Sequence, residues 1–167
     1  MDPLNHNPAP ADLLTPVLVL MDEPATSDEE VIRRLSRHLF EHGAVLDTHA
    51  DATVARERLY PTGLELGGVN AALPHTDVEH VRHNAIAVAI PRSPIVFQHM
   101  ADPDLSTNVG VVIMLAINQK DAMVPLLASL ALMLQDGSTL AAMAAATSPE
   151  EVVAAFRAGI AASEGAP

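Results

Sequence analysis

The sequence predicts a single-domain α/β sandwich, in which a mostly buried mixed β-sheet is flanked by helices. Two observations lead to this class. Apolar runs with strand character alternate with segments of helical periodicity, which is the pattern of an α/β fold. The 167 residues, 49% of them hydrophobic, are enough to bury a core and few enough to form one domain. We expect this domain over residues 13–162, a flexible arm over 1–12 and a tail over 163–167.

The chain begins with a predicted strand and a predicted helix. The apolar run 17–21 lies between a proline and an Asp-Glu-Pro turn, which suits a strand. In the helix that follows, Ser27 and Glu30 have the spacing of a capping box, and apolar residues recur at helical spacing until Gly43.

A second helix is expected from Thr48 to Leu59. Thr48 and Asp51 resemble another capping box at its start. The segment Tyr60-Pro-Thr-Gly63 then forces a turn.

Three apolar runs follow and predict buried strands, because the longest is too continuous for a strand with one face in water. They cover 69–73, 85–90 and 109–117. A short edge strand is expected at 95–97, after Pro94.

Three predicted helices complete the domain. They cover 125–135, 139–146 and 149–162. The last has the clearest start, with Ser148 as N-cap, Pro149 at the first helical position and Glu151 completing a capping box.

Composition excludes several classes of function. The formal net charge is −12 and only nine Lys and Arg are present, so the clustered cations of a general nucleic-acid binder are lacking. The absence of cysteine excludes disulfides, thiolate metal sites and a cysteine nucleophile, and fits a reducing cytosol. Neither a phosphate-binding glycine motif nor the G-x-S-x-G elbow of serine hydrolases is present.

No segment reads as a membrane span or an export signal. The longest apolar stretches, 109–117 and 122–134, fall short of the roughly 20 residues that a bilayer requires. Residues 1–12 lack the basic and apolar regions of a signal peptide. We therefore expect a cytoplasmic protein.

One histidine directly follows a predicted strand. His75 comes after the apolar run 69–73 and Pro74, at a strand end where a reactive group is held rigid and reachable. An imidazole in such a place can act as a nucleophile.

A metal site is the alternative use of the histidines in this segment. His75, His80 and His83 lie close together in sequence, but only the last two have the spacing of ligands on one helix, and no third ligand is defined. We predict no metal and no cofactor. His80 and His83 are interpreted as polar residues that cap or flank the loop.

Two segments carry a resemblance to a known family. Tyr60-Pro-Thr-Gly-Leu64 and Ala71-Ala-Leu-Pro-His-Thr-Asp77 resemble the phosphorylation-site region of the enzyme IIA components of the bacterial phosphoenolpyruvate-dependent sugar phosphotransferase system, in the fructose and mannitol group. The run from His75 to His80 is similar to the galactitol type. The resemblance extends over residues 15–158 and includes the Arg56-Glu57 pair.

The resemblance implies a phosphocarrier. Phospho-HPr would donate its phosphoryl group to Nε2 of His75, and His75 would pass it to a cysteine of an enzyme IIB partner, for uptake of a sugar or a galactitol-like polyol. It implies no nucleic-acid partner and contact with the membrane only through enzyme IIC. Neutral imidazole is readily available near pH 7, because the ordinary pKa of histidine is about 6.5.

Supporting roles follow from the same resemblance. Arg56 would offset the charge of the phosphoryl group, unless it is a solvated helix residue. Pro74 would hold the strand end, and Thr76 would donate a hydrogen bond to a phosphoryl oxygen; both residues would otherwise only shape the turn. Asp77 would orient a ring or cap a helix.

One position departs from the family pattern. Many members carry a second histidine at the start of the helix after the long strand, where this chain has Asp121. A carboxylate repels a phosphoryl group, yet it can hold the neutral tautomer of His75 before transfer. His99 is the alternative as a spatial substitute for that histidine, or it is an exposed residue.

Two other functions stay open at this point. The first is a regulatory module, in which phosphorylation of His75 controls binding to another protein. The second is a metal-dependent enzyme. We expect no attached DNA-binding, IIB or membrane domain, and the galactitol-like signature of the run from His75 to His80 favours transport.

Overall fold

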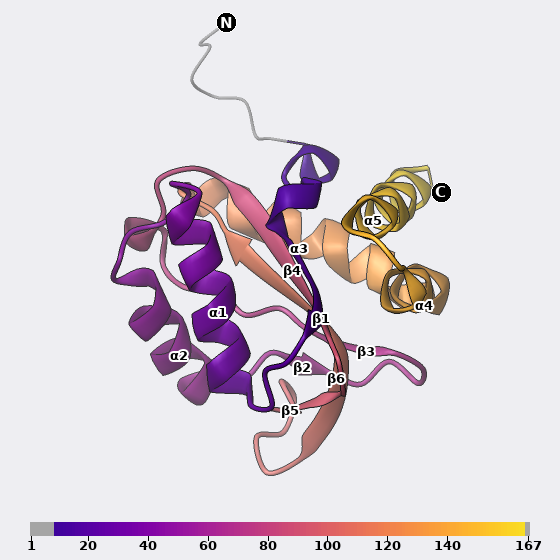
Figure 1. The fold of residues 1–167 in the computed structure, drawn as a ribbon, viewed down its shortest axis with the longest axis horizontal. Helices are drawn as coiled ribbons and strands as arrows, with labels where there is room; N and C mark the ends of the chain where they lie inside the picture. The colour runs from indigo at the N-terminus through magenta and orange to yellow at the C-terminus, as the bar shows by residue number, and fades with distance from the viewer. Residues whose placement is uncertain (1–8, 166–167) are drawn as a thin grey trace, which may run out of the picture.

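The computed structural model describes residues 9–165 and contains a mixed β-sheet with helices on both faces (Figure 1). The hydrogen-bonded strand order is β1-β4-β6-β3-β2, and β5 pairs with β6 off this path. The strands are β1 (Val19–Glu23), β2 (Gly63–Leu64), β3 (Asn70–Ala72), β4 (Ala85–Pro91), β5 (Ile95–Gln98) and β6 (Ser106–Ala116). The predicted fold class is confirmed.

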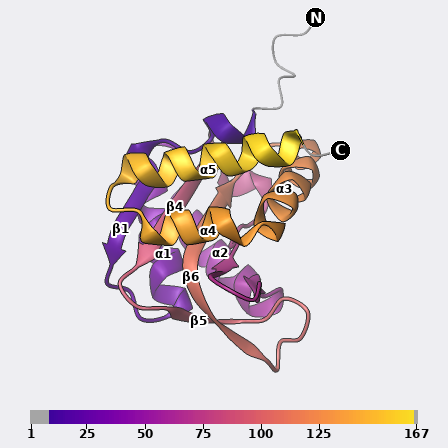
Figure 2. The same ribbon diagram turned by 90° about the vertical axis from the view of Figure 1, so that its right-hand side faces the viewer.

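The helices form two layers around this sheet. One face is covered by α1 (Asp28–Glu41) and α2 (His49–Leu59). The other face is covered by α3 (Lys120–Gln135), α4 (Gly137–Ala145) and α5 (Pro149–Glu164), which lie in front of the sheet in Figure 2. Three short 3-10 turns complete the structure, η1 (Pro10–Asp12), η2 (Pro16–Leu18) and η3 (Val78–His80).

The long strand β6 organises the sheet. One of its edges pairs with β4 and β5, both antiparallel, and the other pairs with β3 in parallel. Every residue of 85–90 and 111–117 is buried, because helices cover both faces. The buried strands predicted for these two runs are confirmed.

Two predicted helix starts are also confirmed. Ser27 Oγ accepts a hydrogen bond from Glu30 N at 3.1 Å and begins α1, which ends before Gly43 at φ 77°, a conformation that favours glycine. Ser148 Oγ accepts from Glu151 N at 3.2 Å and begins α5.

The capping box predicted for α2 is wrong. The helix begins at His49, as expected within one residue, but the Thr48 side chain makes no cap bond. Its hydroxyl lies 2.8 Å from His80 Nδ1, while Asp51 accepts from Arg33 Nη1 at 2.7 Å. Both side chains are therefore used by tertiary contacts in place of the local box.

The predicted start of α3 at Pro125 is also wrong, because the helix begins five residues earlier at Lys120. Proline removes one backbone donor from a helix, but Ala122 and Leu126 are buried one turn apart and anchor both sides of the proline on the core. Packing thus outweighs a local helix-breaking signal.

Helical elements are present at both ends of the described chain. Residues 1–8 of the predicted arm and 166–167 of the predicted tail lie outside the described residues. Pro10–Asp12 form η1, which α5 holds because Arg157 Nε donates to Ala11 O at 3.1 Å. At the other end, α5 continues to Glu164, beyond the expected end at 162.

No single helix within residues 9–165 has the length and apolarity to cross a membrane. Within the described residues, α3 and α4 are long and apolar enough only when they are taken together, and the two helices are bent by 84° relative to each other.

Candidate active site

His75 lies just beyond the end of β3 and stays attached to the centre of the sheet. Leu115 N donates to Pro74 O at 3.1 Å, and His75 forms a parallel bridge with Leu115 of β6. The side chain of His75 is partly buried. The structure therefore places this histidine at a rigid and reachable strand end.

A single hydrogen bond defines the tautomer of the His75 ring. Its Nδ1 lies 2.7 Å from the carbonyl oxygen of Leu73. A carbonyl oxygen only accepts, so Nδ1 must carry the hydrogen. In the neutral ring the lone pair is then on Nε2, which is the nucleophilic nitrogen.

The surroundings of His75 favour this neutral form. Burial lowers the pKa of His75 below its ordinary value of 6.5 and is the largest cause. The bond to Leu73 opposes this change, the positive charge of Arg56 adds to it, and the negative charge of Asp77 opposes it. An imidazole with a lowered pKa is neutral at pH 7.

Arg56 and Asp77 meet beside this ring. Arg56 comes from the last turn of α2, and its Nη1 lies 3.6 Å from Asp77 Oδ1. Its guanidinium carbon is 5.3 Å from the ring centre of Tyr60, within the range of a cation–π contact. Asp77 precedes η3 but makes no side-chain cap bond. Its carboxylate faces Arg56 in place of the helix end.

Pro74 and Thr76, the two neighbours of His75, are buried. The roles predicted for both residues stay predictions.

Among the described residues, no hydrogen bond or ion pair links Asp121 or His99 to His75, and the roles predicted for the two residues stay predictions. Asp121 is exposed in the first turn of α3, and the charges that shift the pKa of His75 are those of Arg56 and Asp77. The Leu73 carbonyl holds the ring tautomer. His99 lies beside Gly63 of β2, and its Nδ1 accepts from Ala101 N at 3.0 Å.

Glu57, which the sequence indicated only as a member of the Arg56-Glu57 pair, is a buried carboxylate behind the site. Glu57 is 6% exposed and accepts hydrogen bonds from Thr62 N at 2.8 Å and Thr62 Oγ1 at 2.9 Å. Burial raises its pKa to about 7, although both bonds from Thr62 oppose this change. Helical spacing indicates this burial, because Glu57 lies three and four residues after Val54 and Thr53 and therefore on the same buried face of α2.

The other two histidines of the segment have separate surroundings. His80 Nδ1 is bonded to Thr48, and His80 Nε2 lies 3.6 Å from Glu79. His83 is exposed. Over residues 9–165 no group of three or more His, Asp or Glu side chains is placed to hold a metal ion.

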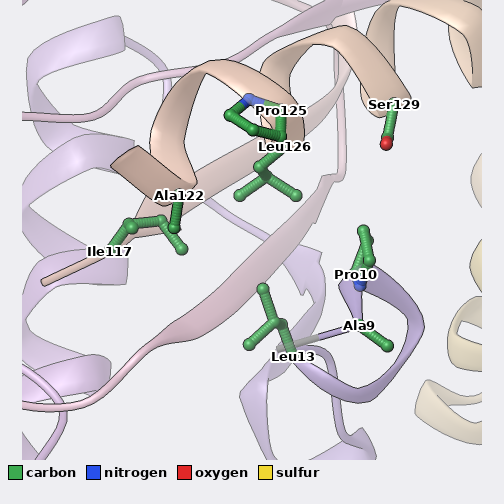
Figure 3. Close-up of a pocket in the computed structure, with 8 residues that line it drawn as sticks. All are labelled: Ala9, Pro10, Leu13, Ile117, Ala122, Pro125, Leu126 and Ser129. Carbon is green, nitrogen blue, oxygen red and sulfur yellow. The ribbon is translucent and has the colours of Figure 1, made fainter. Parts of the chain in front are cut away.

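A small apolar pocket lies elsewhere, between η1 and α3 (Figure 3). It has a volume of about 190 Å³, and Leu13 and Leu126 point toward one another across it. None of the predicted site residues lines this pocket.

Comparison with known families gives one match that covers most of the chain. The model of the family described as "Phosphoenolpyruvate-dependent sugar phosphotransferase system, EIIA 2" matches residues 12–158.

Curated relatives are similar over shorter stretches. The galactitol-specific EIIA component of the phosphotransferase system of Escherichia coli K12 is 33% identical over 98 residues, which are 59% of this chain and 65% of that protein. The match thus spans just under two thirds of this relative. The transcriptional regulator ManR of Bacillus subtilis is 30% identical over 107 residues, 64% of this chain and 15% of the regulator.

Among solved structures, the fold is similar to mannitol enzyme IIA of Escherichia coli, determined in complex with phosphorylated mannitol enzyme IIB. The TM-score is 0.70 and the identity 27%, with 87% of this chain and 97% of the other covered.

Proposed function

Because this chain belongs to the EIIA 2 family of the phosphoenolpyruvate-dependent sugar phosphotransferase system, we propose that it is a phosphocarrier whose reactive group is His75. The proposal rests on the tautomer and the lowered pKa of the His75 ring. A hydrogen bond from Nδ1 to Leu73 O leaves the lone pair on Nε2, and the lowered pKa keeps the ring neutral near pH 7. Phospho-HPr is the donor and a cysteine of enzyme IIB is the acceptor.

Transfer consists of two in-line displacements. The Nε2 lone pair of His75 attacks the phosphorus of the donor phosphohistidine, a new N–P bond forms, and the donor imidazole leaves with the electrons of the broken P–N bond. The proton on His75 Nδ1 stays in place throughout. In the second step the cysteine thiolate attacks phosphorus, and Nε2 recovers its lone pair.

The neighbours of His75 stabilise charge during these steps. The guanidinium of Arg56 offsets the negative phosphoryl group when it exchanges its loose contact with Asp77 for phosphoryl oxygens. The buried Thr76 hydroxyl donates to a phosphoryl oxygen. Catalysis is then mainly positioning and electrostatic stabilisation.

The pathway that we propose is uptake of a galactitol-like polyol or sugar. The similarity to a galactitol-specific EIIA component supports it, together with the run from His75 to His80. The protein works in the cytoplasm and contacts the membrane through enzyme IIC. A regulatory role is the second candidate, because ManR, a transcriptional regulator, is also similar to this chain.

The proposal is tested with radiolabelled phosphoenolpyruvate, enzyme I and HPr. The wild-type chain should take up phosphate that is labile to acid and stable to alkali, and His75→Ala should abolish this uptake. His83→Ala is the matched control, because His83 is exposed on the same segment, and it should label normally.

Two results would overturn the proposal. One is normal labelling of His75→Ala, and the other is a phosphorus NMR spectrum of the labelled protein that places the phosphoryl group on a residue other than His75. Passage of the label to a galactitol-type enzyme IIB supports transport, and labelling without such passage supports the regulatory role.

A further inference from the structure

A chain of hydrogen bonds connects the buried face of α2 to the ring of His75. The Glu57 carboxylate accepts from Thr62 Oγ1 at 2.9 Å. Thr62 Oγ1 accepts from Leu73 N at 3.1 Å. The carbonyl of the same Leu73 accepts from His75 Nδ1 at 2.7 Å. Three hydrogen bonds, joined through the backbone of Leu73 between its N and its carbonyl, thus connect these four residues.

The direction of each bond follows from the chemistry of its partners. The Leu73 carbonyl accepts only, so the His75 ring donates. The Leu73 amide donates only, so the Thr62 hydroxyl accepts there. The hydrogen of that hydroxyl is then free for Glu57, whose carboxylate also accepts from Thr62 N at 2.8 Å. Glu57 is therefore the final acceptor of the chain.

Burial makes these bonds persistent. Glu57, Thr62 and Leu73 are 6%, 6% and 7% exposed, so water does not compete for their polar groups. A buried polar group without a partner is costly, so the loss of one member forces its neighbours to rearrange.

The charge of Glu57 is not among those that shift the His75 pKa, which belong to Arg56 and Asp77. Glu57 is connected to His75 through the hydrogen bonds instead. Glu57 fixes Thr62, Thr62 fixes the backbone of Leu73, and Leu73 then presents its carbonyl to the ring.

We propose that Glu57 and Thr62 are positioning residues for His75, and that they hold the Leu73 carbonyl where it keeps the ring as the Nδ1–H tautomer. This inference rests on the proposed function, because the tautomer decides which nitrogen attacks phosphorus. Without the hydrogen bonds from Glu57 through Thr62 to Leu73, the proton of the His75 ring can move from Nδ1 to Nε2. Nε2 then has no free lone pair and is no longer a nucleophile.

The test uses Thr62→Val, which keeps the shape of the side chain and removes its hydroxyl. Thr62→Ser keeps the hydroxyl and is the matched control. Nitrogen-15 NMR of the His75 ring, above its pKa and without any phosphoryl donor, measures the two tautomers directly. We expect the Nδ1–H form in the wild type and in Thr62→Ser, and a clear population of the Nε2–H form in Thr62→Val.

Phosphoryl uptake provides the second readout. Thr62→Val should take up label at least tenfold more slowly, while Thr62→Ser stays near the wild-type rate. An unchanged His75 tautomer in folded Thr62→Val would overturn the inference. If Thr62→Val does not fold, Glu57→Met decides in its place, because it keeps the approximate size of the side chain and removes both oxygen atoms that accept from Thr62. An unchanged tautomer in that variant is equally contrary.

The two proposals fail in different ways. If wild-type protein does not label on His75, the proposed function fails, whereas the tautomer measurement needs no donor and stands. If the wild type labels normally and the His75 tautomer is unchanged in Thr62→Val and in Glu57→Met, only the proposed positioning role of Thr62 and Glu57 fails.

Discussion

The imidazole of His75 is held between a carbonyl oxygen on one nitrogen and a pair of opposite charges nearby. The carbonyl of Leu73 sets the tautomer, and Arg56 lowers the pKa of the ring while Asp77 raises it. Burial is the larger cause of the lowered pKa. The two charges oppose each other in their effect on this pKa. Under the proposed function it is the guanidinium of Arg56 that receives the negative phosphoryl group.

Replacing Arg56 with glutamine should slow phosphoryl uptake about ten- to hundredfold. Hydrogen bonds to charged groups contribute about 1.5–3 kcal/mol, and each 1.36 kcal/mol changes a rate about tenfold. The same change should raise the pKa of His75, because the positive charge that lowers it is removed. Single-turnover transfer from phospho-HPr and an NMR titration of the ring measure the two effects.

Arg58→Gln is the matched control for this prediction. Arg58 lies two residues further along α2 and pairs with Glu29 at 2.7 Å, so its loss should leave both measurements unchanged. Equal uptake rates in Arg56→Gln and Arg58→Gln would show that Arg56 is only a solvated helix residue.

Helix α2 supports the site on two sides at once. Successive helix residues point about 100° apart, so Arg56 reaches the surface near Asp77 while Glu57 turns into the protein toward Thr62. A rotation of α2 would therefore displace the charge partner and the positioning group together. The packing of α1 and α2 against the sheet is part of the site for this reason.

Contact between α4 and α5 depends on a glycine. A Cβ added at Gly159 would lie 2.5 Å from Cγ2 of Thr139 and 2.9 Å from Cγ of Met133. Alanine in a helix is favoured over glycine by about 1 kcal/mol, but overpacking costs about 1–3 kcal/mol. Because Thr139 is β-branched and buried, the overpacking cost should dominate.

Gly159→Ala should accordingly lower the free energy of unfolding by up to about 2 kcal/mol, the overpacking cost less the helix-propensity gain, measured by urea denaturation. Gly137→Ala is the control, since a Cβ at Gly137 meets no atom within 4 Å, and it should be neutral or stabilising. Equal stability of the two variants would mean that α4 and α5 do not approach each other at Gly159.

Two buried titratable groups give the whole molecule opposite responses to acid. Burial lowers the pKa of His49 to about 4, and the charge of His80 adds to this. Between pH 6.5 and 4 the unfolded chain binds a proton that the folded chain does not, so stability falls as the pH falls.

Burial raises the pKa of Glu57 to about 7, with Asp28 of α1 adding to it. Between pH 7 and 4.5 the folded chain binds the extra proton, so stability rises as the pH falls.

Each effect amounts to about 3 kcal/mol over its full range, at 1.36 kcal/mol per pKa unit. The stability of the wild type should therefore vary little between about pH 6.5 and 4.5. In Glu57→Gln the opposing effect of Glu57 is lost. His49 and His75, whose pKa values are both lowered, then act in the same direction, and the urea midpoint should fall steadily over this range.

Glu65→Gln, at an exposed carboxylate, is the control for this pH experiment and should follow the wild type. Parallel curves for the wild type and Glu57→Gln would contradict the raised pKa of Glu57.

The sequence alone determined the fold class, most of the strands and helices, the family resemblance and the choice of His75. These depend on residues a few positions apart, whose spacing, caps and turns act locally. The tertiary structure decided what surrounds His75. Sheet register brings Leu73 and Thr62 into hydrogen-bonding contact with Glu57, and packing carries α3 past its proline. Such contacts depend on the approach of segments distant in sequence, which local free energies do not specify.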